Sequence, residues 1–294
     1  MTYSVVAADP ASGLVGVAAQ SHHVAVGAQL AFAEPNVAAV AVQSYADRAY
    51  GPAILEAVRG GASGADALAS RVAADPHSSR AQVAVVTASA ETAVHTGSRC
   101  VPAAGHTSAA GASAQANMVS SSRVWADALK ACVTSTGHLT ERLLAALDAA
   151  EAAGGDLRGR QSAVLLVVGG DGTRLDVRVD DALDPLPELR RLAGLQLAAR
   201  QMSAAFALAA KGGTAEAVQM LMGAQGVFGP DNLEPTAWAA VLLARAGDTR
   251  GAGGLLRLAA SSHPNWTEFV RRLATVGLFP DDAVLLDSVT GATR

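Results

Sequence analysis

Short apolar runs, rich in valine and alanine, dominate the first part of the chain, and turn-forming residues separate them. Runs of about 4–8 residues with such borders are typical of β-strands. We expect strands at 3–8, 14–20, 37–44, 83–88, 92–96, 113–118, 162–168 and 174–179. Several of these runs follow one another across a short turn, which favours hairpins and antiparallel sheets.

Helical spacing of apolar residues, three or four positions apart, occurs between these strands. We expect helices at 52–58, 64–73, 123–134 and 139–153, the last one followed by Gly154 and Gly155 as a stop signal. The glycine-rich segment 169–172 precedes a strand and not a helix, which favours a hairpin turn over a phosphate-binding loop. This order predicts a layered α+β domain over residues 1–195 rather than a Rossmann fold.

The remainder, residues 196–294, is predicted to be a small all-α domain. An arginine-rich helix at 188–201 is expected to lead into it, and SHPNWTEFVRRL (262–273) is expected to cap it. Between them, LAAKGGTAEAVQML (208–221) aligns with LARAGDTRGAGGLL (243–256) at an offset of 35. Each copy predicts a helix, a glycine turn and a second helix, and resembles tetratricopeptide-type helical pairs.

Two helical repeats are fewer than the ~3 that usually form a stable array. We therefore expect contacts with the first domain or with a partner to stabilise the helical domain. We also expect the chain to form a homo-oligomer, for instance a dimer. The formal net charge of -4 argues against nucleic acid or an anionic membrane surface as a partner.

Neither a signal-peptide pattern nor an apolar run of the ~18–20 residues that span a bilayer is present. The only cysteines, Cys100 and Cys132, have no zinc-site spacing. We expect a cytoplasmic protein that uses no metal and no cofactor and binds no nucleic acid and no membrane.

Thr2 is the first candidate for chemistry, because the chain opens Met-Thr. Methionine is normally removed before so small a residue, and Thr2 would then carry a free α-amine. Such a threonine combines a nucleophile with a base, since Oγ attacks a carbonyl and the amine takes its proton. An α-amine titrates near pH ~7.7–8, so much of it is a free base at neutral pH. Many cytosolic proteins also begin Met-Thr by chance.

The first hairpin predicts the neighbours of Thr2. Its turn begins at Asp9, so antiparallel pairing brings Thr2 opposite about residue 20. Polar residues therefore lie at the Thr2 end of the sheet: Gln20, Ser21, His22 and His23. A strand ending in Gln43 and Ser44 is expected to run next to this pair. His22 and His23 have an alternative interpretation as a solvated strand end.

A rival nucleophile and base are offered by Cys100 and His106, in the loop SRCVPAAGH (98–106). Glycine, proline and reactive side chains together are typical of a functional loop. Cysteine is also a common small core residue, which is the alternative interpretation. Ser-His-Asp chemistry has no GxSxG motif to support it.

Six separated blocks, in order along residues 1 to about 195, carry a family resemblance. They are MTYSVVAADPASGLVGVAAQS, AVQSYADRAYGP, HTGSRCVPAAGH, SAQANM, AAGGDLRGRQSAVLLVV and VRVDDALDPLPELRRL. Together they resemble an uncharacterised bacterial, Ntn-hydrolase-like family whose members begin Met-Thr-Phe-Ser. The resemblance implies a four-layer αββα sandwich with two antiparallel sheets at its centre, and hydrolysis of an amide-type C–N bond by Thr2. Some members carry a C-terminal extension.

The residues and the resemblance together give a hypothesis for the site. Thr2 is the nucleophile, and Asn117 is the first candidate donor to the oxyanion because it lies in a matching block. Gln43 and Ser21 come next as donors. No lysine is available near Thr2, since Lys130 and Lys211 are the only two in the chain.

Four residues are expected to contact the substrate: His22, Arg160, Cys100 and His106. Arg160 suits bidentate binding of a carboxylate, and its alternative interpretation is a surface arginine at a strand entrance. The expected activity is that of an amidohydrolase on a small amide-type substrate. The alternatives are a noncatalytic ligand- or partner-binding protein, with the helical repeats as docking surface, and an assembly subunit.

Overall fold

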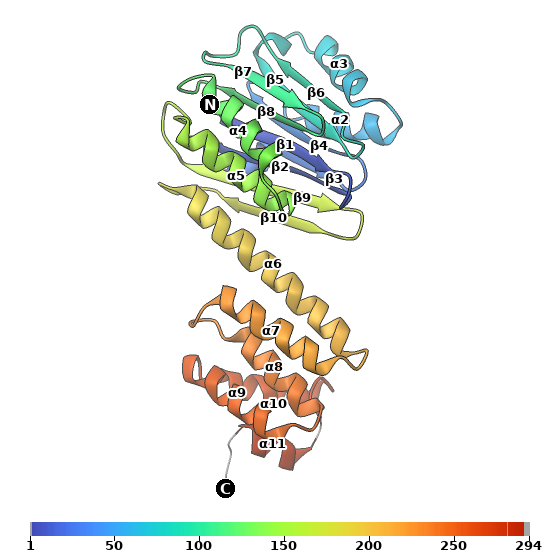
Figure 1. The fold of residues 1–294 in the computed structure, drawn as a ribbon, viewed down its shortest axis with the longest axis vertical. Coiled ribbons are helices and arrows are strands. Elements are labelled where there is room, and N and C mark those ends of the chain that lie inside the picture. Colours follow the sequence, from blue (N-terminus) through green and yellow to red (C-terminus); the bar gives the residue numbers. More distant parts are fainter. Residues whose placement is uncertain (1, 281, 291–294) are drawn as a thin grey trace. The chain divides into compact units, whose positions relative to one another are not determined.

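The structure is a computed structural model that describes residues 2–280 and 282–290 (Figure 1). It divides into two compact units, one that ends at Ala193 and one that begins at Gly194. The division falls within helix α6 (Pro185–Ala209). The sequence predicted a boundary after residue 195.

The first unit contains two antiparallel sheets. The larger has the order β10-β9-β2-β1-β8-β7, with β1 (Thr2–Asp9), β2 (Leu14–Ser21), β7 (Gly105–Ala109), β8 (Ala112–Asn117), β9 (Ser162–Gly169) and β10 (Arg174–Val179). The smaller has the order β3-β4-β5-β6, with β3 (Ala31–Glu34), β4 (Ala38–Ser44), β5 (Ala81–Thr87) and β6 (Thr92–Thr96). The antiparallel α+β class expected from the hairpins is confirmed.

Helices cover the outer face of each sheet (Figure 1). Helices α4 (Arg123–Thr134) and α5 (Leu139–Ala152) pack on the larger sheet, chiefly on β1, β2 and β8. Helices α2 (Tyr50–Arg59) and α3 (Gly64–Ala74) pack on the smaller one through a shared apolar cluster. All four lie where helical spacing predicted helices.

Helix α1 (Gly27–Leu30), strand β3 and strand β7 were not expected from the sequence. Strand β3 reads Ala-Phe-Ala-Glu, which is too short to show a period of two. Strand β7 reads Gly-His-Thr-Ser-Ala and lies at the edge of its sheet, where polar side chains face solvent. The short 3-10 turn Ser78–Arg80 was not expected either.

The position of β4 corrects one expectation. The strand that ends in Gln43 and Ser44 does not lie beside the first hairpin, because the neighbours of β1 are β2 and β8. Strand β4 belongs to the other sheet and faces β1 across the space between the sheets. Gln43 therefore approaches Thr2 from the opposite sheet.

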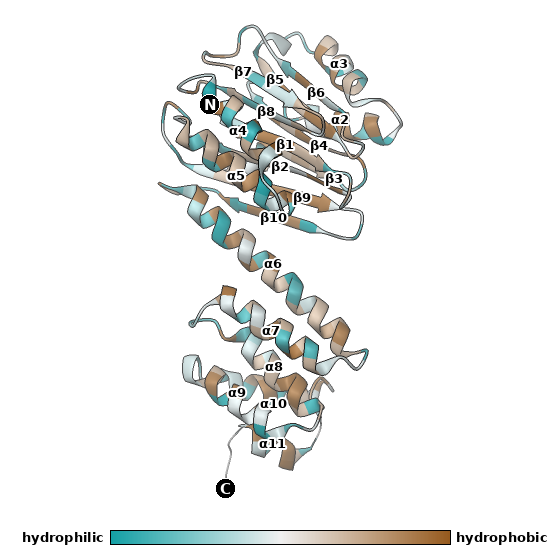
Figure 2. Ribbon diagram, viewed as in Figure 1, coloured by the Kyte–Doolittle hydropathy of each residue, from teal (hydrophilic) through white to brown (hydrophobic). Residues whose placement is uncertain are grey.

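The layer between the sheets is apolar along most of its length and polar at one end. Val6 and Ala8 of β1 pack there with valines and alanines of β2, β4, β5 and β9, strands that Figure 2 shows as largely hydrophobic. Side chains alternate between the two faces of a strand, so Thr2 and Ser4 lie on the same face as Val6. Buried polar residues from both sheets surround them: Gln43, Gln82, Ser113, Gln115 and Asn117.

The second unit is helical, as expected. Besides the end of α6 it contains α7 (Thr214–Phe228), α8 (Glu234–Arg245), α9 (Thr249–Ser262), α10 (Asn265–Thr275) and α11 (Ala283–Thr290). Edge-to-face aromatic contacts connect its core, with ring centroids 5.1 Å apart for Phe206 and Trp238 and 5.3 Å apart for Trp238 and Phe269. Within the described residues, no helix combines the length and the apolar character needed to cross a membrane.

The repeat seen in the sequence has the same backbone geometry in both copies. Gly212 and Gly247 follow the first helix of each copy, with φ angles of 93° and 88°. The amide of Gly213 donates to the carbonyl of Leu208 (3.1 Å), and that of Asp248 donates to the carbonyl of Leu243 (3.0 Å). A glycine in the left-handed region commonly ends a helix in this way. Each copy is therefore a helix, a glycine turn and a second helix.

Two glycine substitutions in this unit should act in opposite directions. A Cβ at Gly212 or at Gly254 meets nothing within 4 Å, but Gly212 has a φ of 93° while Gly254 lies inside α9. Gly212→Ala should lower the free energy of unfolding by about 1–2 kcal/mol, because alanine resists the left-handed region. Gly254→Ala should raise it by about 1 kcal/mol through helix propensity. Thermal unfolding followed by tryptophan fluorescence tests both, and equal effects would contradict the assignment.

Candidate functional site

A cavity of about 150 Å³ lies beside Thr2, at the polar end of the layer between the sheets. It is lined by the ends of β1, β2 and β4, by α1 and by the loops before α1 and after β4. The lining residues are Thr2, Ser21, His23, Val26, Gln29, Leu30, Val42, Gln43, Ser44, Ala46 and Arg48. Thr2 is 6% exposed, so its side chain is enclosed by protein and not by open solvent.

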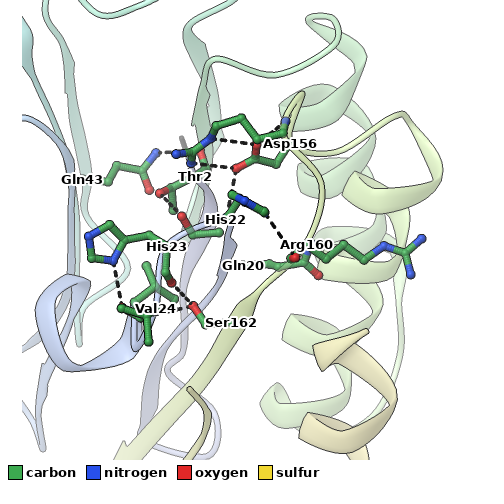
Figure 3. Close-up of polar contacts among 12 residues, drawn as sticks. Thr2, Gln20, His22, His23, Val24, Gln43, Asp156, Arg160 and Ser162 are labelled. Carbon is green, nitrogen blue, oxygen red and sulfur yellow. Dashed lines mark hydrogen bonds and ion pairs between the residues drawn. The ribbon is translucent and has the colours of Figure 1, made fainter. Parts of the chain in front are cut away.

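The hydroxyl of Thr2 lies among polar groups (Figure 3). Its Oγ1 donates to Oγ of Ser21 at 3.0 Å, and its carbonyl oxygen lies 3.4 Å from Nε2 of Gln43. The strand pairing places Tyr3 opposite Gln20 and Asp9 opposite Leu14. The expected neighbourhood of Thr2 and Ser21 is confirmed, and Asp9 lies at the far end of the hairpin.

A network of uncharged side chains connects the two sheets behind Thr2. Oε1 of Gln82 accepts from Nε2 of Gln43 (2.6 Å) and from Nδ2 of Asn117 (3.0 Å). Ser4 donates to Oε1 of Gln43 (2.6 Å) and accepts from Nε2 of Gln115 (2.6 Å). Nε2 of Gln82 donates in turn to the carbonyl of Ala116 in the opposite sheet at 3.0 Å. Buried amides are costly unless satisfied, so these bonds fix the distance between the sheets at this end.

Asn117 lies opposite Thr2 in the pairing of β1 with β8. Its Nδ2 is already bonded to Gln82, while its Oδ1 is buried and has no hydrogen-bond partner in the described part of the chain. Asn117 is not among the residues that line the cavity, whereas Gln43 is. Of the three predicted oxyanion donors, Gln43 and Ser21 thus line the cavity and Asn117 does not.

The end of β4 has a strained backbone where it borders the cavity. Ser44 has a φ of 65°, in the left-handed region that non-glycine residues rarely adopt. Its Oγ is buried and has no hydrogen-bond partner among the residues that the structure describes. Strain of this kind and an unsatisfied hydroxyl are concentrated at functional sites in proteins, and here they border the cavity of Thr2.

The two adjacent histidines point to different places. His23 lines the Thr2 cavity, and its Nδ1 lies 2.8 Å from the carbonyl of Val24. His22 lines a separate cavity of about 320 Å³ with Arg160 and Asp181. The sequence analysis chose His22 as the substrate contact, whereas the structure brings His23 to Thr2. Successive side chains along an extended chain point to opposite faces, and this alternation could have distinguished His23 from His22.

Arg160 extends away from Thr2 (Figure 3). Its guanidinium bonds Oε1 of Glu151 at 2.6 Å and Oδ1 of Asp184 at 2.9 Å. These hydrogen bonds raise the pKa of the guanidinium. The predicted carboxylate ligand is thus replaced by two carboxylates of the protein, and the structure does not bring Arg160 to the Thr2 cavity.

Glu151 also anchors β1 from the outer face of the sheet. Its Oε2 accepts from the hydroxyl of Tyr3 (2.8 Å) and from Nε2 of Gln20 (2.9 Å). Burial and the adjacent carboxylate raise the pKa of Tyr3 well above its ordinary value. The residue after Thr2 is therefore fixed by a charge-assisted hydrogen bond, which the phenylalanine implied by the family resemblance would not make.

Cys100 and His106 do not form the rival pair. The thiol of Cys100 donates to the carbonyl of Ala81 at 3.4 Å, and Nδ1 of His106 bonds Oγ1 of Thr96 at 2.9 Å. Burial, and to a lesser degree His95, lowers the pKa of His106. Neither residue lines the Thr2 cavity, so neither predicted substrate contact is brought there.

Two charged groups near the site were missed by the sequence analysis. Arg48 lines the cavity, and it lies within one of the six blocks, AVQSYADRAYGP. Asp156 is buried, accepts from the backbone amide of His22 at 3.1 Å and pairs with Arg158 at 3.3 Å. Their positions depend on tertiary contacts and not on a local pattern. Among residues 2–280 and 282–290, no three His, Cys, Asp or Glu side chains gather as metal ligands would.

Comparison with known proteins identifies the family. A family model described as "Family of unknown function (DUF1028)" matches residues 2–189. The chain belongs to the DUF1028 family. This agrees with the uncharacterised bacterial family expected from the sequence. The match ends before the helical unit, so the helices after α6 lie outside the part that defines a DUF1028 protein.

One solved DUF1028 structure is similar to this chain. It is the crystal structure of protein SPO2555 from Silicibacter pomeroyi, with 31% sequence identity and a TM-score of 0.62. The match covers 65% of this chain and 84% of that chain. A search of curated proteins finds no relative.

Replacing Gln82 tests the network behind Thr2. Gln82→Leu keeps a similar volume but leaves the amides of Gln43 and Asn117 without their shared acceptor. An unpaired buried polar group costs about 1–3 kcal/mol, so we expect the free energy of unfolding to fall by about 3 kcal/mol. Hydrogen exchange of the amides in β4 and β5 measures this change. The half-buried Gln161→Leu is the control, and a similar loss in both variants would contradict the role of Gln82.

Proposed function

We propose that this DUF1028 protein is an amidohydrolase whose nucleophile is Thr2, made available when removal of Met1 exposes its α-amine. The observation that carries the proposal is the enclosure of Thr2. Its side chain borders a small cavity and its hydroxyl bonds Ser21, at the one end of the inter-sheet layer that is polar. A structural threonine at a strand end requires neither a cavity nor a buried amide network.

The layered arrangement supports the same proposal. The family resemblance implies an Ntn-hydrolase-type αββα sandwich, and the two facing sheets with helices on their outer faces are compatible with it. The resemblance assigns the reaction to the amino-terminal residue, here Thr2, and Thr2 is the first residue of β1, a strand with neighbours on both sides. The family name states no function, so the chemistry rests on the site and not on the family.

The proposed reaction proceeds in two steps. Oγ1 of Thr2 attacks the carbonyl carbon of the amide, and the α-amine of Thr2 accepts the hydroxyl proton. The C–N bond then breaks, the leaving amine takes that proton, and the acyl group remains on Oγ1 as an ester. In the second step the α-amine deprotonates a water molecule, which attacks the ester and releases the acid. Thr2 is thereby regenerated.

The surrounding residues have distinct roles in this scheme. Ser21 orients Oγ1 of Thr2 through the 3.0 Å hydrogen bond. Gln43 is the proposed donor to the oxyanion, because it lines the cavity. Its Nε2 would exchange a long 3.4 Å contact, with the carbonyl of Thr2 or of Gln115, for the oxyanion. Asn117 is the proposed acceptor for the α-amine, because its buried Oδ1 has no other partner and β8 pairs Asn117 with Thr2.

Substitution of Thr2 tests the nucleophile directly. Thr2→Ala should abolish turnover of any small amide, ureide or acyl-amino acid that the wild-type protein hydrolyses, whereas Thr2→Ser should keep measurable turnover because it retains a hydroxyl. Removal of one hydrogen bond to Ser21 costs only about 1 kcal/mol of stability, so both variants should fold. Intact mass spectrometry establishes whether Met1 is absent from the active protein.

Three results would contradict the proposal. They are retention of Met1 in active protein, unchanged turnover by Thr2→Ala, and the absence of hydrolysis across the amide panel. Binding of a panel compound without turnover would favour the noncatalytic ligand-binding alternative. Assembly into a homo-oligomer stays a separate prediction, which sizing of the full chain tests.

The pH dependence of turnover distinguishes the base. An α-amine is active only when deprotonated, so kcat/KM should rise with pH through the pKa of that amine. Its ordinary pKa is ~7.7–8, so we expect the inflection in this range. The control is His23→Gln, since His23 is the titratable base in the cavity lining. Loss of the inflection in this variant would assign the base to His23 and contradict the role of the amine.

A further inference from the structure

Among the described residues that line the cavity, Arg48 alone has a side chain that is cationic throughout the physiological pH range. It lies in the loop between β4 and α2, and its Nε donates to the carbonyl of Ala28 at 3.1 Å. Its guanidinium carbon lies 5.2 Å from the centre of the Phe32 ring. The backbone and an aromatic face therefore hold the guanidinium in place, and its two terminal amino groups are not used by these contacts.

The lining of the cavity offers no negative charge to balance Arg48. None of the lining residues that the structure describes is Asp or Glu. Nor does any carboxylate in residues 2–280 and 282–290 form an ion pair with Arg48, although Arg160 pairs with both Glu151 and Asp184. Arg48 is exposed and its guanidinium has no carboxylate partner among the described residues, so it is suited to a carboxylate of a ligand.

The size of the cavity limits the ligand. Pockets for drug-sized molecules have volumes of about 300–1,000 Å³, and this one has about 150 Å³. Such a space suits a small molecule in which the amide and the carboxylate lie only a few bonds apart. The same cavity borders Thr2, Gln43 and Arg48, so the amide can meet Thr2 while the carboxylate meets Arg48.

We infer that the substrates are small carboxylated amides of the N-acyl-amino-acid class, and that Arg48 binds their carboxylate. This inference rests on the proposed function for the position of the reacting amide. It replaces Arg160, whose charge is neutralised within the protein, as the residue that recognises the acid group. Arg48 acts in binding and selectivity, while bond cleavage is assigned to Thr2.

Binding to a variant that cannot turn over separates recognition from catalysis. The protein is the full chain with Thr2→Ala, and the probes are N-acetylglycine, N-acetylalanine and N-acetylserine, each beside its primary carboxamide. Each pair has nearly the same shape and differs in charge. We expect the acids to bind at least about tenfold more tightly than the carboxamides, as measured by calorimetry or by NMR titration, because a charge-assisted bond replaces a neutral one.

Substitution of Arg48 assigns the preference. Adding Arg48→Met should weaken binding of the acids by about tenfold to a hundredfold and leave binding of the carboxamides unchanged. Arg48→Lys should restore part of the loss, since lysine keeps the charge but not the planar fork. The matched control is Arg123→Met, which removes an exposed arginine of α4 that pairs with Asp127.

The outcomes separate this inference from the proposed function. Equal binding of acids and carboxamides, an unchanged preference after Arg48→Met, or no binding of any of the acids would overturn the inference. If wild-type protein nevertheless hydrolysed amides through Thr2, the proposed function would stand without it. The opposite result is a carboxylate preference that depends on Arg48, in a protein whose turnover does not depend on Thr2. It would support Arg48 as the carboxylate site and contradict Thr2 as the nucleophile.

Discussion

The hydrogen bonds of Gln82 are the constraint on which the site depends. A layer between two sheets is normally apolar, and most of this one is, from Val6 and Ala8 onward. At the end of β1, amides and hydroxyls replace the apolar side chains, and each has to find a partner across the gap. Gln82 accepts from Gln43 and Asn117 and donates to the opposite sheet. The spacing of the sheets and the position of Thr2 are set by the same bonds.

This network is uncharged, and its neutrality shapes the chemistry available to Thr2. A buried lysine or carboxylate between the sheets would need a charged partner or would shift its pKa. The charges instead lie at the borders. Glu151 fixes Tyr3 from the outer face of the sheet, and Arg48 borders the cavity. In the proposed reaction, the candidates for the base are the α-amine of Thr2 and His23, and the candidate oxyanion donor is the neutral amide of Gln43.

Much of this arrangement could be predicted from the sequence. The turn at Asp9 fixed the pairing of β1 with β2, and this pairing brought Ser21 to Thr2. Three local expectations failed for tertiary reasons. Gln43 approaches Thr2 from the opposite sheet and not from a neighbouring strand of the same sheet. The pattern of residues within a strand does not indicate which sheet the strand joins. His22 and His23 line different cavities. Arg160 lies outside the Thr2 cavity and pairs with Glu151 and Asp184, whereas Arg48 lines that cavity.

One segment connects the neutral network to the charged border. Strand β4 holds Gln43 in the inter-sheet bonds and ends at Ser44, whose left-handed φ of 65° redirects the chain toward the loop of Arg48. Such a conformation persists in a non-glycine residue only where the surroundings determine it. The contacts of Arg48 with Ala28 and Phe32 fix the other end of this short path. Gln43 and Arg48 belong to one short segment of the chain. The buried hydrogen bonds that hold Gln43 therefore also limit where the positive charge of Arg48 lies relative to Thr2.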